Sequence, residues 1–292
     1  MENLIIGKKA LSKAVADLLP RRVLWAVESL TADFEIEEIR LRRDGNVWVC
    51  GGRENLDLGV KITGEEIEDI LIKACGGSVY SSADSIKKGY VFAGDGVRVG
   101  VCGEWTSGGV RKISSLAVRV PHRVKIDVSG VRPLLEGFGM SRGLLAFSPP
   151  LGGKTSFLRE AARALSSGES PLRVVVVDTR GELAYSLDGN LCIDILSRYP
   201  RKEGIEIASR TMGAQVVVCD EIGGGEYGAI SELHGGGVPI VASAHAAGLA
   251  DLLSKKGISE LHKDGVFGAY LELFRGQDPP YKCHFWEDCR DI

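Results

Sequence analysis

The sequence of 292 residues lacks any long apolar run. No stretch approaches the ~18 consecutive apolar residues that a membrane-spanning helix needs, and the N-terminal residues lack the apolar core of a secretory signal peptide. Internal repeats and low-complexity tracts are also missing. Because 44% of the residues are hydrophobic and 26% are charged, the composition is that of an ordinary globular protein. We therefore expect a cytoplasmic protein, long enough for two domains.

Paired cysteine motifs are absent as well. The seven cysteines are an odd number, and no two of them have the C-x-x-C spacing. Cys283, His284 and Cys289 could offer a zinc ion only three ligands at an unusual spacing, so reduced side chains that bind no metal are the favoured interpretation. A large excess of positive charge is missing too, since the net charge is −3. This balance argues against a general nucleic-acid binder, and no DNA partner is expected.

The first 130 residues predict a smaller α/β domain. An amphipathic helical pattern covers residues 8–29 and is expected to be kinked or divided at Pro20. Two β-like runs follow, joined by a hairpin signal at Asp44-Gly45, and then a helix capped by Thr63. The expected ranges are Ile36–Arg42 and Val47–Cys50 for the strands, Thr63–Ala74 for the helix, and short strands separated by glycine turns from Tyr90 to Val120.

The pattern changes between residues 125 and 140, so we place the domain limits at 1–130 and 131–292. Strands and helices alternate after this point, which indicates a parallel sheet with helices on both faces. Strands are expected at Leu144–Phe147, Arg173–Val177, Val216–Cys219, Pro239–Ala242 and Gly268–Leu273.

A phosphate-binding loop is indicated directly after the first of these strands. A strand, a glycine-rich turn, Lys-Thr and a helical pattern follow one another, which is the context of a P-loop. The lysine would neutralise the phosphates, and the Thr155 hydroxyl would ligate Mg²⁺. An ordinary Gly/Pro turn before a surface helix is the alternative. The predicted nucleotide-binding residues are Ser148, Pro149, Pro150, Leu151, Gly152, Gly153, Lys154, Thr155 and Ser156.

A second acidic motif follows the apolar strand that ends at Cys219. Such buried parallel strands carry functional groups at their carboxyl ends. Asp220 could hold Mg²⁺ through water, and Glu221 could orient or deprotonate an attacking water. Two acidic residues also occur as plain strand terminators, but their position after a P-loop favours the functional interpretation.

Two further strand ends carry polar groups. Asp178 follows a run of four valines, and Glu182, four residues later, could help to position water if that strand is parallel to the others. The alternative is a capped, solvated loop. His245 ends another strand and could contact a terminal phosphate or respond to its loss, although a histidine in such a loop can also have no role.

Basic residues are locally enriched, with nine basic against three acidic residues between Lys87 and Arg132. Such a stretch is usually only a solvated face. In a chain with a P-loop its arginines are also candidates for contacting phosphate, and Arg98 and Arg119 are the first choices as catalytic arginines.

Together these motifs resemble the stage III sporulation protein AA family, a branch of the secretion-type ATPases. The resemblance covers nearly the whole chain. In the N-terminal half it rests on residues 37–42, 88–91, 98–103 and 116–120. In the C-terminal half it rests on residues 176–178, 180–183, 215–223 and 244–245.

The resemblance implies a RecA-like P-loop ATPase domain with a mostly parallel sheet, preceded by a smaller α/β domain. It also implies ATP and Mg²⁺ as ligands and a homo-oligomer, most simply a hexameric ring. The expected partners are membrane-embedded channel or secretion proteins of the sporulation stage III complex, which would place the chain at the inner face of the cell membrane. Catalysis would involve Glu221, Glu182, His245, Arg98 and Arg119, with Thr155 and Asp220 holding the metal.

The chain departs from the family pattern at two places. Ser148 replaces the first glycine of the usual P-loop, and Gly223-Gly224-Gly225 stands where the family usually has an arginine. An ATPase motor is the leading hypothesis, and these departures motivate a second one, a nucleotide-binding scaffold with little hydrolysis. A nucleic-acid motor is the third, motivated only by the basic stretch.

Overall fold

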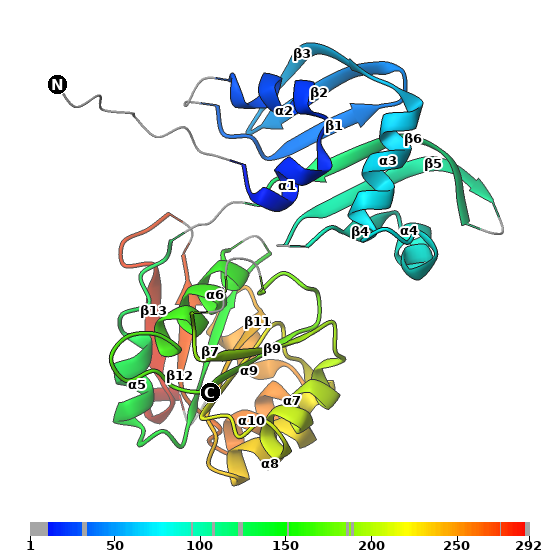
Figure 1. Cartoon of the computed structure of the whole chain (residues 1–292). Coiled ribbons are helices and arrows are strands. Elements are labelled where there is room, and N and C mark those ends of the chain that lie inside the picture. The colour runs from blue at the N-terminus through cyan, green and yellow to red at the C-terminus, as the bar shows by residue number, and fades with distance from the viewer. Residues whose placement is uncertain are drawn as a thin grey trace. The chain divides into compact units, whose positions relative to one another are not determined.

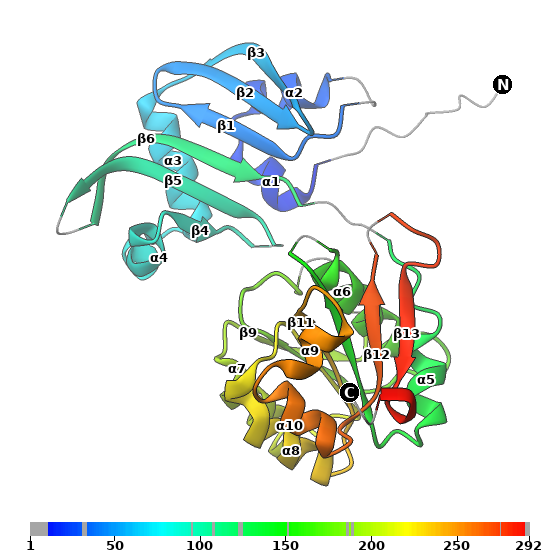
Figure 2. The same ribbon diagram turned by 180° about the vertical axis from the view of Figure 1, so that it is seen from behind.

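The chain is described by a computed structural model over residues 11–30, 34–94, 96–106, 109–121, 125–150, 152–184, 187, 190–274 and 276–289. It divides into two compact units, Met1–His122 and Arg123–Ile292. Figures 1 and 2 show the elements of both units from opposite sides.

The first unit is a six-stranded antiparallel sheet with its helices on one face (Figures 1 and 2). In β1, Ile39 and Leu41 are buried against the helices while Arg40 is exposed, as expected where only one face of a sheet is covered. The strand order is β3-β2-β1-β6-β5-β4. The elements are α1 (Lys13–Leu18), α2 (Arg21–Glu28), β1 (Glu38–Arg42), β2 (Gly45–Gly51), β3 (Glu54–Ile62), α3 (Gly64–Ala74), η1 (Tyr80–Ser82), α4 (Ala83–Lys87), β4 (Tyr90–Phe92), β5 (Arg98–Thr106) and β6 (Gly109–Arg119).

Local sequence signals account for most of this unit. Pro20 separates α1 from α2, and Asp44, with φ of 56°, turns the chain between β1 and β2. Thr63 caps α3 in a capping box with Glu66, so this predicted helix is confirmed. The prediction of short strands from Tyr90 to Val120 is wrong in length, because β5 and β6 form one long hairpin. The glycines at 100 and 103 lie inside β5 and not in turns, and Gly103 lies at a small shift of the register.

The second unit is a seven-stranded sheet in the order β13-β12-β7-β11-β10-β8-β9. All neighbours are parallel except β12 and β13. The elements are α5 (Val131–Gly137), β7 (Gly143–Ser148), α6 (Lys154–Leu165), β8 (Val174–Asp178), β9 (Ile193–Ser197), α7 (Arg201–Arg210), β10 (Val216–Cys219), η2 (Gly224–Glu226), α8 (Tyr227–Gly235), β11 (Ile240–His245), α9 (Leu249–Ser254), α10 (Ile258–Lys263), β12 (Phe267–Leu273), β13 (Tyr281–Phe285) and η3 (Trp286–Cys289).

Helices cover both faces of this sheet, as the sequence predicted (Figure 1). Alternate residues of β8 belong to two separate cores. Val174 and Val176 pack in the core that contains α5 and α6, whereas Val175 and Val177 pack in the core that contains α7 to α10. A strand buried on both sides in this way has a continuous apolar sequence.

Two strands of the second unit were not predicted, and both lie at an edge of the sheet. In β9 the side chains of Asp194 and Ser197 are exposed, and in β13 Lys282 is exposed. An edge strand buries only some of its side chains, so its sequence does not form a continuous apolar run. His284 in β13 contacts Glu272 of β12 (Nε2 to Oε2, 3.0 Å).

Among the described residues, no helix is both long and apolar enough to cross a membrane.

Candidate nucleotide-binding site

The strand ends that carry polar groups meet at one edge of the second sheet. β7, β11, β10 and β8 are neighbours in this order and run parallel, so their carboxyl ends share that edge. His245 lies opposite Ser148 in the β11–β7 register, and Cys219 lies opposite Val177 in the β10–β8 register. The residues that follow, Asp220 and Asp178, are therefore brought to the same place from distant parts of the chain.

The loop after β7 turns into α6 through Gly153, whose φ of 92° is a conformation that favours glycine. Lys154, the first residue of α6, is 5% exposed. Its Nζ donates to three oxygens of the loop itself, the carbonyls of Ser148 (3.0 Å) and Pro149 (2.9 Å) and the Ser148 hydroxyl (3.1 Å). Burial lowers the pKa of the Lys154 ammonium, while the charge of Glu221 raises it and that of Arg180 lowers it.

Ser148 fits the first position of the loop for a steric reason. Its hydroxyl donates to the Pro149 carbonyl (3.0 Å), and a Cβ built on Gly152 would lie only 2.2 Å from the Ser148 hydroxyl oxygen. The serine side chain thus fills the space beside Gly152. Of the other predicted loop residues, Thr155 and Ser156 lie in the first turn of α6 and are partly exposed, and Leu151 lies outside the described residues.

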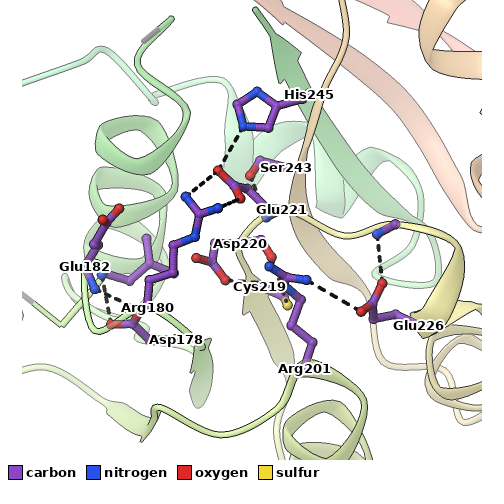
Figure 3. Close-up of polar contacts among 12 residues, drawn as sticks. Asp178, Arg180, Glu182, Arg201, Cys219, Asp220, Glu221, Glu226, Ser243 and His245 are labelled. Atoms are coloured by element: carbon purple, nitrogen blue, oxygen red, sulfur yellow. Dashed lines mark hydrogen bonds and ion pairs between the residues drawn. The ribbon is translucent and has the colours of Figure 1, made fainter. Parts of the chain in front are cut away.

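Asp178 acts on the loop that follows β8. Its carboxylate, which is fully buried, accepts three backbone N–H groups, from Glu182 (3.0 Å), Leu183 (2.9 Å) and Ala184 (2.9 Å). The Glu182 carbonyl accepts from Arg159 (2.7 Å), which fixes the loop at a second point. The Glu182 carboxylate points away from that of Asp178 (Figure 3).

Asp220 is a buried carboxylate with spare bonding capacity. It is 3% exposed, and its Oδ1 atom has no hydrogen-bond partner among the described residues; the nearest cation is Arg201, whose Nε is 3.8 Å away. Burial raises the pKa of Asp220 to about 6; Arg201 lowers it, whereas Asp178 and Glu221 raise it. A buried carboxylate oxygen without a partner is suited to bind Mg²⁺, either directly or through a water molecule on the ion. The Thr155 hydroxyl would supply a second oxygen at the start of α6.

Glu221 lies in a strained backbone conformation, with φ of 44°. Its N–H donates to the Ser243 hydroxyl (3.0 Å), and the next N–H donates to the Ser243 carbonyl (2.8 Å), so β11 holds the turn in place. The carboxylate contacts both Nη atoms of Arg180 (3.0 and 2.5 Å) and Nε2 of His245 (3.0 Å), as Figure 3 shows. Glu221 is therefore held at once by Arg180, from the loop after β8, and by Ser243 and His245 of β11.

Two arginines of this site were missed in the sequence. Arg180 was noticed only as part of a family motif, although it follows a strand end by two residues. Arg201 begins α7 and lies near both Asp220 and Glu226 (Nη1 to Oε1, 3.6 Å). Glu226 in turn accepts from the N–H of Gly223 (2.8 Å), the first residue of the run Gly223-Gly224-Gly225. No local pattern marks Arg201, because only the packing of α7 on the sheet brings it there.

The two arginines that the sequence did single out lie in the first unit. The Arg98 guanidinium lies over the ring of Tyr90, 4.4 Å from its centroid. Arg119 is exposed at the end of β6, opposite Glu38 of β1. Their roles as catalytic arginines stay predictions.

Comparison with known proteins agrees with the family resemblance. A family model for sporulation stage III, protein AA, matches residues 9–285. The stage III sporulation protein AA of Bacillus subtilis (strain 168) is 32% identical over 284 residues, which cover 91% of this chain and 92% of the relative.

Solved structures show the fold. The Yersinia pseudotuberculosis ATPase DotB is similar with a TM-score of 0.56 at 13% identity, over 91% of this chain and 78% of its own. The pilus retraction motor PilT with bound ADP gives a TM-score of 0.60 at 12% identity, over 90% and 80%. The predicted fold class, a RecA-like domain with a mostly parallel sheet preceded by a smaller α/β domain, is confirmed. By sequence, the chain belongs to the sporulation stage III protein AA family.

Proposed function

We propose that this protein binds ATP with Mg²⁺ at the carboxyl edge of the second sheet and hydrolyses it. The observation that carries the proposal is the convergence at this edge of Lys154, the first residue of α6, with Asp220 and Glu221, which follow β10. A glycine-rich loop that leads into α6 suits the phosphates, because backbone N–H groups and the positive end of the helix dipole attract anions.

The residues at this edge divide the proposed reaction among them. Lys154 exchanges its three contacts with the loop for contacts with the β- and γ-phosphates. Thr155 and Asp220 hold Mg²⁺, which would neutralise the charge that develops on the phosphates. Glu221 orients the attacking water and accepts its proton, and His245, which already contacts the Glu221 carboxylate, keeps that carboxylate in position. Glu182 helps to order the water from the β8 side.

The family and the fold suggest how the activity is used. We infer a homo-oligomer, a hexamer, that works at the inner face of the cell membrane with channel or secretion proteins of the sporulation stage III complex. The relative from Bacillus subtilis is named for sporulation, and the similar solved structures are named as an ATPase and a pilus motor. Arg98 or Arg119, from the same or a neighbouring copy, would stabilise the transition-state charge, a contribution of about 10³- to 10⁵-fold for arginine fingers.

The test is phosphate release from Mg-ATP by the purified full-length chain, over a wide range of protein concentrations, with the mass in solution measured in parallel. Lys154→Ala should lower turnover by about 100-fold or more, since it removes a charged contact to the phosphates. Lys202→Ala, at an exposed position of α7, is the matched control and should leave turnover unchanged. Equal phosphate release by the wild type and Lys154→Ala at every concentration would refute the proposal.

A second candidate is a scaffold that binds ATP and assembles without appreciable hydrolysis. It is favoured by the contacts of Glu221, whose carboxylate is engaged by Arg180 and His245 and so is not free for water. The glycines at 223–225 also favour a scaffold, because the family usually has an arginine there. Tight ATP binding and ring formation without phosphate release would select this candidate.

A further inference from the structure

Arg180 contacts the proposed catalytic Glu221, but the proposed reaction gives Arg180 no role. It lies in the loop after β8, which Asp178 fixes through three backbone N–H groups. From this fixed base its side chain reaches across the edge of the sheet to Glu221 (Figure 3). The Arg180 side chain is 49% exposed, whereas that of Glu221 is 18% exposed. The loop that carries Arg180 is thus fixed, while the guanidinium that contacts Glu221 is half exposed to solvent.

The same guanidinium belongs to the surroundings of the phosphate-binding lysine. The charges of both Glu221 and Arg180 act on Lys154. These groups therefore share one electrostatic environment, in which Glu221 is an anion and Lys154 and Arg180 are cations. A nucleoside triphosphate bound at Lys154 would bring a second and stronger anion into this environment.

The two anions compete for one donor group. Guanidinium groups bind carboxylates and phosphates with the same paired geometry, and a terminal phosphate carries more charge than a carboxylate. A half-exposed ion pair such as Arg180–Glu221 is weak, because solvent screens it and holding two side chains costs entropy. Exchange of the carboxylate for a phosphate is therefore favourable. A diphosphate lacks the terminal phosphate, so Arg180 would keep its contact with Glu221 when a diphosphate binds.

We propose that Arg180 distinguishes ATP from ADP: its guanidinium holds Glu221 in the nucleotide-free chain and moves to the terminal phosphate when ATP binds, which frees Glu221 to act on water. The inference rests on the proposed function and adds to it a specificity-determining contact. It also explains why Arg180 and His245 contact the Glu221 carboxylate. These contacts describe the nucleotide-free chain and do not mean that the site is inactive.

The test compares the affinities of the full-length chain for ADP and for β,γ-imido-ATP, both with Mg²⁺. Arg180→Ala should weaken binding of β,γ-imido-ATP by about 10- to 100-fold, the range of a charged hydrogen bond, and leave the affinity for ADP within about twofold. Arg180→Lys keeps the charge without the paired geometry and should fall between. Arg210→Ala, which breaks the exposed paired contact with Glu232, is the matched control and should change neither affinity.

A double-mutant cycle tests the exchange itself. Glu221→Gln removes the charge that holds Arg180 and should strengthen binding of β,γ-imido-ATP by about two- to fivefold, the size of a weak ion pair. In the Arg180→Ala background the same change should have no such effect. A gain that persists without Arg180 would overturn the exchange, because Glu221 would then act on the phosphate directly.

The outcomes separate this inference from the proposed function. If the wild type binds neither nucleotide, or Lys154→Ala binds as well as the wild type, the proposed function fails and this inference fails with it. If Lys154→Ala loses binding but Arg180→Ala binds β,γ-imido-ATP as tightly as the wild type, only this inference is overturned. Equal losses of ADP and β,γ-imido-ATP would likewise overturn it, since they would show a structural role for Arg180.

Discussion

Replacement of Asp220 by asparagine should stabilise the folded chain while it abolishes ATP hydrolysis. The carboxylate is almost fully buried, and its Oδ1 atom has no hydrogen-bond partner among the described residues. Arg201 is close enough to attract the charge, at 3.8 Å, but not to form a hydrogen bond. A buried charge with incomplete compensation costs free energy, and a neutral amide of the same shape avoids that cost.

The magnitude follows from the pKa of Asp220. Burial raises this pKa from 3.8 to about 6, and each pKa unit corresponds to ~1.4 kcal/mol. The ionised side chain therefore costs the folded chain about 3 kcal/mol at pH 7. This value already contains the attraction of Arg201, because that attraction opposes the rise in the pKa. The side chain is too deeply buried for solvent to screen much of the effect.

The pH dependence gives the prediction its sign. Well below pH 4 the side chain is protonated in both the folded and the unfolded chain and contributes no difference. Between about pH 4 and pH 6 the folded chain binds more protons than the unfolded chain, so the free energy of unfolding of the wild type falls as the pH rises. An asparagine side chain does not titrate, so the Asp220→Asn variant lacks this dependence on pH. Its advantage in free energy of unfolding should therefore grow by about 2 kcal/mol between pH 4 and pH 7.

Trp286 allows the second unit to be followed by itself. It is the only tryptophan after residue 122, and its indole N–H donates to the His262 carbonyl (2.8 Å). The other three, Trp25, Trp48 and Trp105, are 73%, 41% and 67% exposed and can be replaced by phenylalanine. Urea unfolding of this background, with and without Asp220→Asn, is then measured by fluorescence from pH 4 to pH 7.

An exposed aspartate provides the control. Asp194→Asn, on the edge strand β9, should change the free energy of unfolding by less than ~0.5 kcal/mol at each pH. The reasoning is refuted if Asp220→Asn is less stable than the wild type at pH 7, or if the difference between them does not change with pH. Either result would mean that Arg201 fully compensates the buried charge.

Three further predictions concern packing and capping. Gly152→Ala should weaken nucleotide binding by about tenfold, since its Cβ would lie 2.2 Å from the Ser148 hydroxyl oxygen; adding Ser148→Gly should restore most of the affinity, and titration of ADP measures both. Gly204→Ala should lower the free energy of unfolding of the second unit by about 1–3 kcal/mol, because its Cβ would lie 2.5 Å from Cγ1 of Val177 on β8; an unchanged urea midpoint would contradict this packing. Thr63→Ala should destabilise the first unit by ~1 kcal/mol through loss of the α3 cap, while Thr63→Ser should be close to neutral in the same measurement.

The sequence alone determined the features that depend on local chemistry. The glycine-rich turn before Lys154, the valine run of β8, the cap at Thr63 and the break at Pro20 each act through neighbouring residues, so a linear pattern is enough to recognise them. The alternation of strands and helices also implied a parallel sheet. Parallel strands end at one edge, which is why the sequence assigns Asp178, Asp220 and His245 to one place.

The tertiary structure decided what each of these groups contacts. Asp178 accepts three backbone N–H groups of its own loop and is fully buried, a contact that the sequence did not specify. The edge strands β9 and β13 were missed, because an edge strand is only half buried and leaves no continuous apolar signal. Arg201 reaches Asp220 only because α7 packs on the sheet.

The contact between Arg180 and Glu221 shows most clearly which features the sequence determines and which the tertiary structure decides. Each residue follows a recognisable strand, and the sequence places both at the carboxyl edge of the sheet. Which charges meet there depends on the order of the strands, β8 beside β10 and β10 beside β11, and on the turn that Ser243 imposes on Glu221. Strand order is set by the packing of residues far apart in the chain, and a pattern of neighbouring residues carries no record of it.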